Sequence, residues 1–168
     1  KWRKWHKSIE WYYKSYKALI CSTGIRKIIL TIFSSMTWRL IVIEGVDAVW
    51  KTTLAKWLAQ SLNGVYYKTP GTRTSREREV YDREGVSVEE RFRFYLDACR
   101  EDIARIMDIK SGWKDVVCDR LLSSTIAHHQ SMDDSLDTRD AEDLDMSIPK
   151  TQILLQTSRD VIIKRLSE

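Results

Sequence analysis

The sequence predicts an α/β fold built on a parallel sheet. From residue 38 onward, short β-branched runs alternate with stretches of helical periodicity, and this alternation is typical of parallel sheets covered by helices. The chain has 168 residues, 43% of them hydrophobic, which suffices for one domain with a buried core. Only two prolines and six glycines occur, which argues against a collagenous, low-complexity or disordered chain.

Residues 1–35 form a basic, aromatic-rich extension. They hold eight basic residues and one acid, a net charge of +7, whereas residues 36–168 carry a net charge of −3. Apolar residues recur at near-helical spacing from Trp2 to Ile20 with lysines between them, which predicts a basic amphipathic helix. Because Met36 directly precedes the first clear strand, the extension is either a surface-binding or targeting helix, or sequence from outside the native protein.

The first strand and the first helix flank a glycine-containing turn. Residues 38–43 are a β-branched run of the kind that is buried in parallel sheets. A helix is predicted over about 52–62, with three leucines on one face, and Gly64 ends it. Residues 65–68 read as a second strand, which the turn residues of 69–71 stop.

A capping box marks the start of a long helix. Ser87 and Glu90 have the required spacing, and the helical pattern reaches about residue 109. A third strand is predicted over 115–118, after a turn at Gly112.

The last third of the chain repeats the alternation of helix and strand. A helix is predicted over about 122–130, and the acidic, serine-rich stretch 131–146 is expected to be a mobile connection. Residues 151–156 form the fourth predicted strand, and a helix begins near Ser158.

The turn after the first strand carries a phosphate-binding motif with one departure. Gly45, Lys51 and Thr52 match the pattern G-x-x-x-x-G-K-[ST], but Trp50 stands at the second glycine. In such a loop, backbone N–H groups and a helix N-terminus bind phosphates, the lysine binds the outer phosphates and the hydroxyl binds Mg²⁺. An indole would crowd the phosphate, so we expect weak or absent ATP binding. An ordinary strand-to-helix turn is the alternative.

The cysteines favour a reducing compartment. Cys21, Cys99 and Cys118 are odd in number and show no close pairing, which excludes a CxxC motif and disfavours a disulfide framework. We therefore expect a cytoplasmic protein.

From about residue 38 to its end, the chain resembles the thymidylate kinase family of P-loop nucleoside monophosphate kinases. The matching segments, in family order, are 43–47, 51–53, 68–72, 91–96, 117–120, 124–127, 153–155 and 161–165. The resemblance implies a three-layer P-loop NTPase fold over residues 36–168, with the chain ending before the family's lid and last strand. It also implies transfer of the γ-phosphoryl group of ATP, with Mg²⁺, to a deoxynucleoside monophosphate, with dTMP as the expected acceptor.

The resemblance carries site residues with it. Those expected to bind ATP phosphates are Gly45, Lys51, Thr52 and Thr53. Those expected to serve catalysis are Lys51, Asp119 and Arg120, and Thr52 and Asp119 would hold the metal. Those expected to bind the acceptor are Asp47, Arg73, Arg76, Arg100 and Tyr95. The alternative, purely structural roles are a strand-end ion pair for Asp119 and Arg120, solvent exposure for the arginines after Pro70, and helix packing for Tyr95.

Several positions depart from the family pattern. They are Ala48 and Trp50 in the loop, Leu121 after the D-R pair, the pair His128 and His129, and Gln156. Because of Trp50 and the absent lid, we expect doubtful activity for this chain.

Other functions remain open from the sequence. A deoxynucleoside kinase shares the loop and the D-R segment, although the arginines after Pro70 favour a phosphorylated acceptor. A non-catalytic nucleotide-binding protein would use Trp50 to fill the donor pocket. Nucleic-acid binding through residues 1–35 ranks last, because composition alone supports it. The sequence leaves open a homodimer and membrane contact through the extension.

Overall fold

The computed structural model describes residues 19–20, 38–71 and 75–167. Its sheet has five parallel strands in the order β1-β5-β2-β4-β3. The strands are β1 (Leu19–Ile20), β2 (Leu40–Gly45), β3 (Val65–Lys68), β4 (Val116–Asp119) and β5 (Thr151–Leu155). The predicted parallel α/β sheet is confirmed, and β2, which leads into the glycine-containing turn, lies at its centre.

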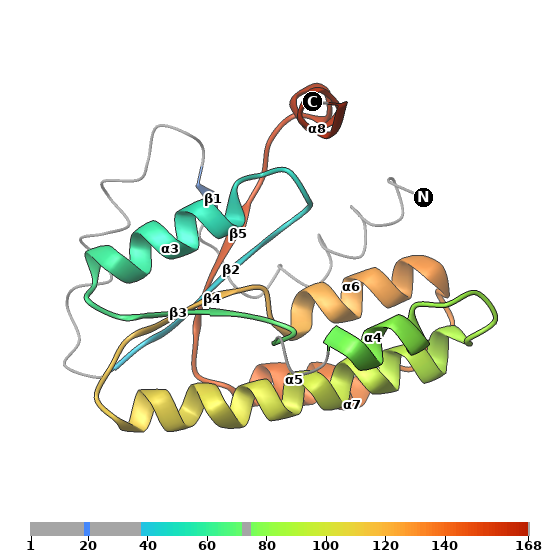
Figure 1. The fold of residues 1–168 in the computed structure, drawn as a ribbon, viewed down its shortest axis with the longest axis horizontal. Helices are drawn as coiled ribbons and strands as arrows, with labels where there is room; N and C mark the ends of the chain where they lie inside the picture. Colours follow the sequence, from blue (N-terminus) through green and yellow to red (C-terminus); the bar gives the residue numbers. More distant parts are fainter. Residues whose placement is uncertain (1–18, 21–37, 72–74, 168) are drawn as a thin grey trace.

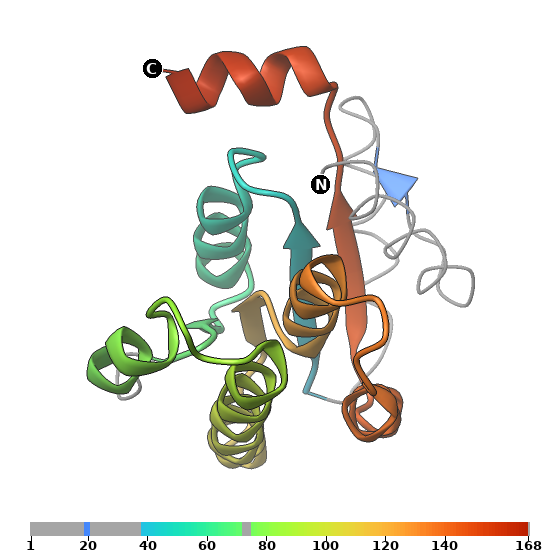
Figure 2. The same cartoon turned by 90° about the vertical axis from the view of Figure 1, so that its right-hand side faces the viewer.

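Helices cover both faces of the sheet and give three layers (Figures 1 and 2). On one face lies α3 (Lys51–Ser61), which contacts β2, β3 and β4. On the other face lie α5 (Val88–Ser111), which contacts β4, and α6 (Leu122–Met132), which contacts β2. The other helices within the described residues are α4 (Ser75–Tyr81), α7 (Arg139–Ser147) and α8 (Arg159–Ser167).

Alternation along β2 divides the core into two clusters. Leu40 and Val42 pack with residues of α5 and α6, whereas Ile41 and Ile43 pack with residues of α3. All four side chains are buried. A strand that is covered on both faces has no solvent face, which explains why residues 40–43 are continuously apolar.

The long helix begins where the capping box predicts. Ser87 Oγ accepts a hydrogen bond from the Glu90 N–H at 3.2 Å, and Glu90 Oε2 accepts one from the Ser87 N–H at 3.2 Å. These two bonds satisfy donors that the first turn of a helix leaves unpaired. Phe92, Leu96 and Cys99, one turn apart, then face the sheet.

Part of the stretch predicted as a mobile connection is a helix. Residues 131–146 contain most of α7. In this helix Ala141 is fully buried, and Leu144 packs against the core cluster that contains Leu40 and Val42. Asp140 and Asp143 are exposed, whereas Asp145 is buried. Together these acids hide the sparse apolar face of the helix in the sequence. The Thr138 hydroxyl, just before the helix, donates to Glu142 Oε1 at 2.6 Å. The prediction of a loop here was wrong.

A second difference concerns the extension. Leu19 and Ile20 form a strand that pairs in parallel with Leu154 and Leu155 of β5, where an amphipathic helix was predicted. The open edge of β5 offers backbone groups that a neighbouring strand can pair. The rest of the predicted helix, residues 1–18, lies outside the described residues.

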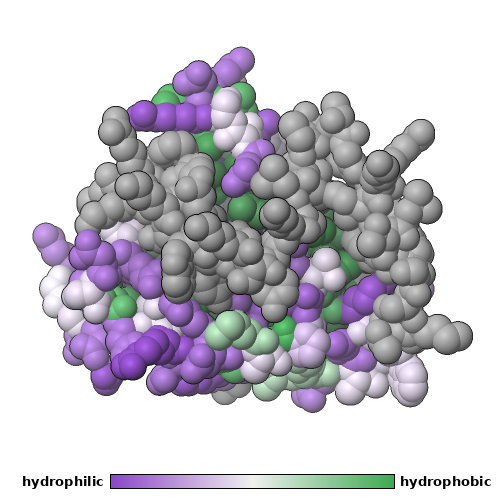
Figure 3. All heavy atoms as spheres, turned by 180° about the vertical axis from the view of Figure 1, so that it is seen from behind, coloured by the Kyte–Doolittle hydropathy of each residue, from purple (hydrophilic) through white to green (hydrophobic). Residues whose placement is uncertain are grey.

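The described residues expose both polar and large apolar side chains, among them Trp113 and Met146. Figure 3 shows hydrophilic side chains over much of the described surface seen from behind. Within the described residues, none of the helices combines the length and the apolar character that a membrane span requires.

Candidate functional site

The loop between β2 and α3 begins at a glycine that no other residue could replace. Gly45 has a φ of +146°, and a Cβ added there would lie 2.5 Å from the carbonyl oxygen of Leu155. The close approach of β5 and the positive φ both require glycine. The loop therefore leaves the sheet at the carboxyl end of β2, where parallel α/β folds place their ligands.

The two loop positions that depart from the family pattern have a left-handed backbone. Ala48 has a φ of 63° and Trp50 a φ of 68°. Trp50 is the residue before the first turn of α3, and it is 60% exposed. The loop thus keeps a conformation that favours glycine although it carries side chains at both positions.

Lys51 turns its ammonium group back into the loop. The side chain is buried, Nζ donates to the carbonyl oxygen of Val46 at 2.5 Å, and it lies 3.7 Å from Asp47 Oδ1. Burial lowers the pKa of Lys51 from its ordinary value. The ammonium is placed at the centre of the loop, where a phosphate oxygen could replace the carbonyl of Val46.

An oxygen pair joins α3 to the end of β4. Thr52 Oγ1 donates to Asp119 Oδ2 at 2.5 Å, and the Tyr66 hydroxyl donates to the same oxygen at 3.3 Å. Burial, followed by the Asp119 charge, raises the pKa of Tyr66 to about 12. A hydroxyl and a carboxylate are hard oxygen ligands of the kind that Mg²⁺ prefers, so the pair fits that ion. The described residues contain no group of three or more His, Cys, Asp or Glu side chains that could hold a metal.

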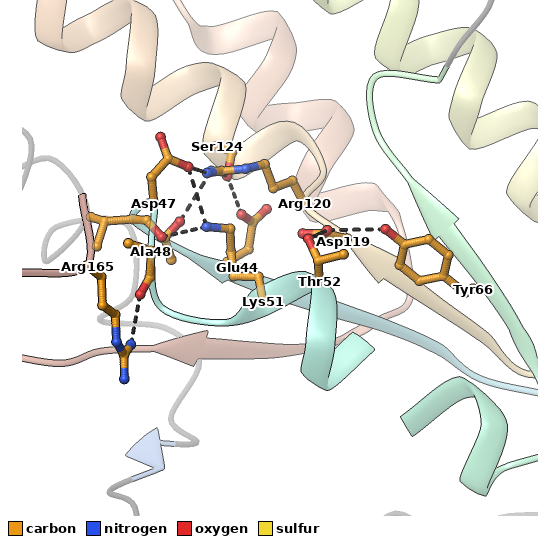
Figure 4. A network of polar contacts seen from close by, with 12 residues as sticks. Glu44, Asp47, Ala48, Lys51, Thr52, Tyr66, Asp119, Arg120, Ser124 and Arg165 are labelled. Carbon is orange, nitrogen blue, oxygen red and sulfur yellow. Dashed lines mark hydrogen bonds and ion pairs between the residues drawn. The ribbon is translucent and has the colours of Figure 1, made fainter. Parts of the chain in front are cut away.

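Arg120 crosses from the end of β4 to the loop. Its Nη1 donates to the Gly45 carbonyl at 3.2 Å and to Ser124 Oγ at 2.9 Å, and its Nη2 pairs with Asp47 (Figure 4). The residue itself has a φ of 71°. Because both contact Asp47, the Arg120 guanidinium lies near the Lys51 ammonium, at the carboxyl ends of β2 and β4.

A buried acid supports that arginine. Glu44 is 1% exposed; it accepts hydrogen bonds from the Leu121 N–H at 2.9 Å and from the Ser124 hydroxyl. Burial raises the pKa of Glu44 to about 7, although these bonds and Arg120 act in the opposite direction. Sequence reasoning assigned Glu44 no role beyond its motif, although an acid that ends an apolar strand is itself a signal.

Lys51, Thr52, Asp119 and Arg120 help to line a cavity of about 460 Å³. Its lining residues are Asp47, Ala48, Trp50, Lys51, Thr52, Lys68, Asp119, Arg120 and Arg165. Four side chains of the lining are cationic and two are carboxylates, so the cavity suits an anionic ligand.

Two of the four cations, Lys68 and Arg165, were not predicted as site residues. Lys68 ends β3, and its place at the carboxyl end of a parallel strand could have pointed to it. Arg165 comes from α8: its Nη1 donates to the Ala48 carbonyl at 2.8 Å, and its guanidinium lies 5.3 Å from the centroid of the Trp50 ring. No local motif marks Arg165, because only the fold brings α8 to the loop.

Other predicted residues lie away from the cavity lining. Thr53 is exposed on the first turn of α3. Arg100 is half exposed and pairs with Asp97 at 2.8 Å on α5. The Tyr95 hydroxyl contacts Arg78 Nε at 2.8 Å.

Two of the arginines predicted to bind the acceptor are not fully covered by the described residues. Arg73 lies outside the described residues. The backbone of Arg76 is in α4 but its side chain is not described.

Among the solved structures that share this fold are two thymidylate kinases. Thymidylate kinase from Ehrlichia chaffeensis is 26% identical, with a TM-score of 0.59, over 77% of this chain and 78% of that one. The chain is thymidylate kinase-like. Thymidylate kinase from Candida albicans is 20% identical with a TM-score of 0.61, over 78% of this chain and 68% of that one, and it supports the fold alone.

Neither a protein-family model nor a curated protein matches the sequence. The resemblance of the thymidylate kinase-like chain to known proteins therefore rests on its fold and on the short motifs that meet at the cavity. These support a kinase of nucleoside monophosphates as the general class.

Proposed function

We propose that this chain transfers the terminal phosphoryl group of ATP to the 5′-phosphate of dTMP, giving ADP and dTDP. The observation that carries the proposal is the convergence of four cations on a cavity that also holds the Thr52 and Asp119 oxygen pair. Phosphoryl transfer needs two phosphates aligned and their charge neutralised, with little covalent help from the protein.

Each side chain has a task in this proposal. Lys51 binds the donor phosphates beside the backbone N–H groups of the loop. Arg120 bridges donor and acceptor phosphates, since its fork of donors suits two oxygens at once. Thr52 and Asp119 would hold Mg²⁺, which when bound neutralises phosphate charge. Asp47, released from Arg120, would accept from the sugar of the acceptor.

The chemistry of the acceptor favours a monophosphate over a nucleoside. A phosphate monoester has a second pKa of about 6 and is mostly a dianion at neutral pH, so it attacks without a general base. The bond from its oxygen to the γ-phosphorus forms while the bond from that phosphorus to the ADP oxygen breaks. A nucleoside hydroxyl would have to lose a proton, and the cationic cavity is better suited to the charged acceptor.

A coupled assay of ADP release tests the proposal. The protein and its Trp50→Gly variant are supplied with Mg·ATP and either dTMP or thymidine, and Lys51→Met serves as the inactive control. We expect ADP release with dTMP in the Trp50→Gly variant and less in the parent. Turnover of thymidine alone would replace the proposal by a deoxynucleoside kinase, and nucleotide binding without any turnover would indicate a non-catalytic binding protein.

A further inference from the structure

Glu44 is an acid inside an otherwise apolar strand. It follows the four core residues of β2 and is itself buried. Both of its carboxylate oxygens have a partner: Oε1 accepts from the Leu121 N–H at 2.9 Å and Oε2 accepts from the Ser124 hydroxyl. A buried carboxylate needs such donors, because without them the loss of hydration opposes burial.

Both partners belong to the segment that carries Arg120. Ser124 has one hydroxyl proton, and it donates that proton to Glu44. Its lone pairs are then left for Arg120 Nη1, which donates to Ser124 Oγ at 2.9 Å. A directed chain of hydrogen bonds runs from Arg120 through Ser124 to Glu44 (Figure 4).

The backbone at Arg120 is fixed by the same region. Its φ of 71° is unusual for a residue with a side chain. The Arg120 N–H donates to the Ile43 carbonyl at 3.0 Å, and the Thr69 hydroxyl donates to the Arg120 carbonyl at 2.9 Å. Glu44 follows Ile43 in the chain and binds the N–H of the residue after Arg120. Glu44 therefore holds the strained backbone segment through the Leu121 N–H. It also holds the Arg120 guanidinium through Ser124.

We propose that Glu44 is a positioning residue, which acts through Ser124 to hold the Arg120 guanidinium at the loop, ready to receive a phosphate. The part of this inference that concerns the phosphate rests on the proposed function, whereas the placement of Arg120 does not. If the role of Glu44 were only structural, it would stabilise the fold, and the position of the Arg120 guanidinium would not depend on the Ser124 hydroxyl.

The placement is tested by NMR of ¹⁵N-labelled arginine side chains in the full chain. Spectra are recorded at about pH 8, above the pKa of about 7 that burial gives Glu44. Arg120 is assigned with Arg120→Lys. We expect separate Arg120 Nη signals in the parent, because hydrogen bonds hold the guanidinium. In Glu44→Gln and Ser124→Ala we expect faster exchange between these signals, because the contacts with Gly45 and Asp47 alone then hold the group.

Two variants make that experiment specific. Ser124→Thr keeps the hydroxyl and is expected to keep the separate signals. Ser123→Ala is the matched control, because the neighbouring Ser123 is a buried serine that contacts Asp145 and Gln152 instead of Glu44. Unchanged Arg120 signals in Ser124→Ala would overturn the inference, even if Glu44→Gln does not fold.

Titration calorimetry with dTMP then tests the consequence for binding. A hydrogen bond to a charged group contributes enough for its loss to weaken the affinity about tenfold, so we expect this loss in Glu44→Gln and Ser124→Ala but not in Ser123→Ala. Equal dTMP affinity in the parent and these three variants would overturn the role of Glu44 in binding. If no protein binds dTMP while the Arg120 signals respond as expected, the proposed function fails and the positioning of Arg120 stands.

Discussion

At the scale of single residues, Trp50 shows how the loop tolerates a bulky side chain. Its φ of 68° and ψ of 27° lie in the left-handed region, which costs an L-residue about 1 kcal/mol or more. The contact with the Arg165 guanidinium, 5.3 Å from the ring centroid, offsets part of that cost, since exposed cation–π pairs contribute about 0.5–1 kcal/mol. The indole is thus held at the rim of the cavity by the side chain of α8.

Replacing Trp50 by glycine should restore nucleotide binding more than it alters stability. The free energy of unfolding should change by less than about 1 kcal/mol, because relief of backbone strain and loss of the stacking contact oppose each other. The affinity for Mg·ATP, measured by titration calorimetry, should rise about tenfold or more, since the phosphate can then approach the backbone. Trp57→Ala, which removes another exposed tryptophan from α3, is the control and should leave the affinity unchanged. Equal affinities of parent and Trp50→Gly would refute the expectation.

Glu44 should leave a signature in the pH dependence of stability. Its pKa rises from 4.5 to about 7 on folding, so between these values the native state binds more protons than the unfolded state. The contribution of Glu44 to the free energy of unfolding therefore falls by about 3 kcal/mol as pH rises through this window and then stays level. Glu44→Gln cannot titrate, and its stability relative to the parent should grow from pH 4.5 to 7. Urea unfolding at a series of pH values measures this difference, and parallel curves would contradict it.

At the scale of elements, α7 depends on a buried ion pair. Asp145 Oδ1 lies 3.0 Å from Lys150 Nζ, and their side chains are 3% and 8% exposed. The lysine follows the helix and ties it to the start of β5. A carboxylate that is left without its cation in such a place is strongly destabilising.

Lys150→Met should lower the free energy of unfolding by about 3 kcal/mol, because the change removes one partner of a buried ion pair. Arg139→Met is the matched control at the other end of α7. It removes an ion pair with Asp137 whose side chains are 83% and 60% exposed, and such pairs contribute less than about 1 kcal/mol. Chemical denaturation measures both variants. Equal small losses would show that the Asp145 pair adds little to the stability of α7.

At the scale of the whole molecule, the order of the strands explains why part of the site was predictable. The motif residues follow β2 and β4, which are neighbours in a parallel sheet, so Lys51 and Arg120 meet at its carboxyl edge. Strands β2 to β5 were located within two residues, whereas β1 was predicted as part of a helix. Of these, β2 and β4 are buried throughout, and such strands read as apolar runs.

What escaped prediction depends on contacts between distant segments. Glu44 and Ser124 are 80 residues apart, and Arg165 meets Ala48 across 117 residues. The α7 helix was missed because its few apolar residues, Ala141 among them, are diluted by acids. No local pattern encodes these contacts, since they arise only when the sheet sets the register of its strands.

A three-layer molecule with its sheet in the middle should unfold as one unit. One variant in each of the two core clusters, which lie on opposite faces of the sheet, tests this. Ile41 packs on the α3 side and Ile106 of α5 on the other, and both are fully buried. Changing either to valine should cost about 1 kcal/mol, because each change removes one buried methylene. Since β2 and β4 contribute to both clusters, each loss should shift the same single transition, with far- and near-ultraviolet circular dichroism coincident. Ile163→Val, at a site 54% exposed on α8, should shift it little. Two separate transitions in either variant would show that the layers unfold independently.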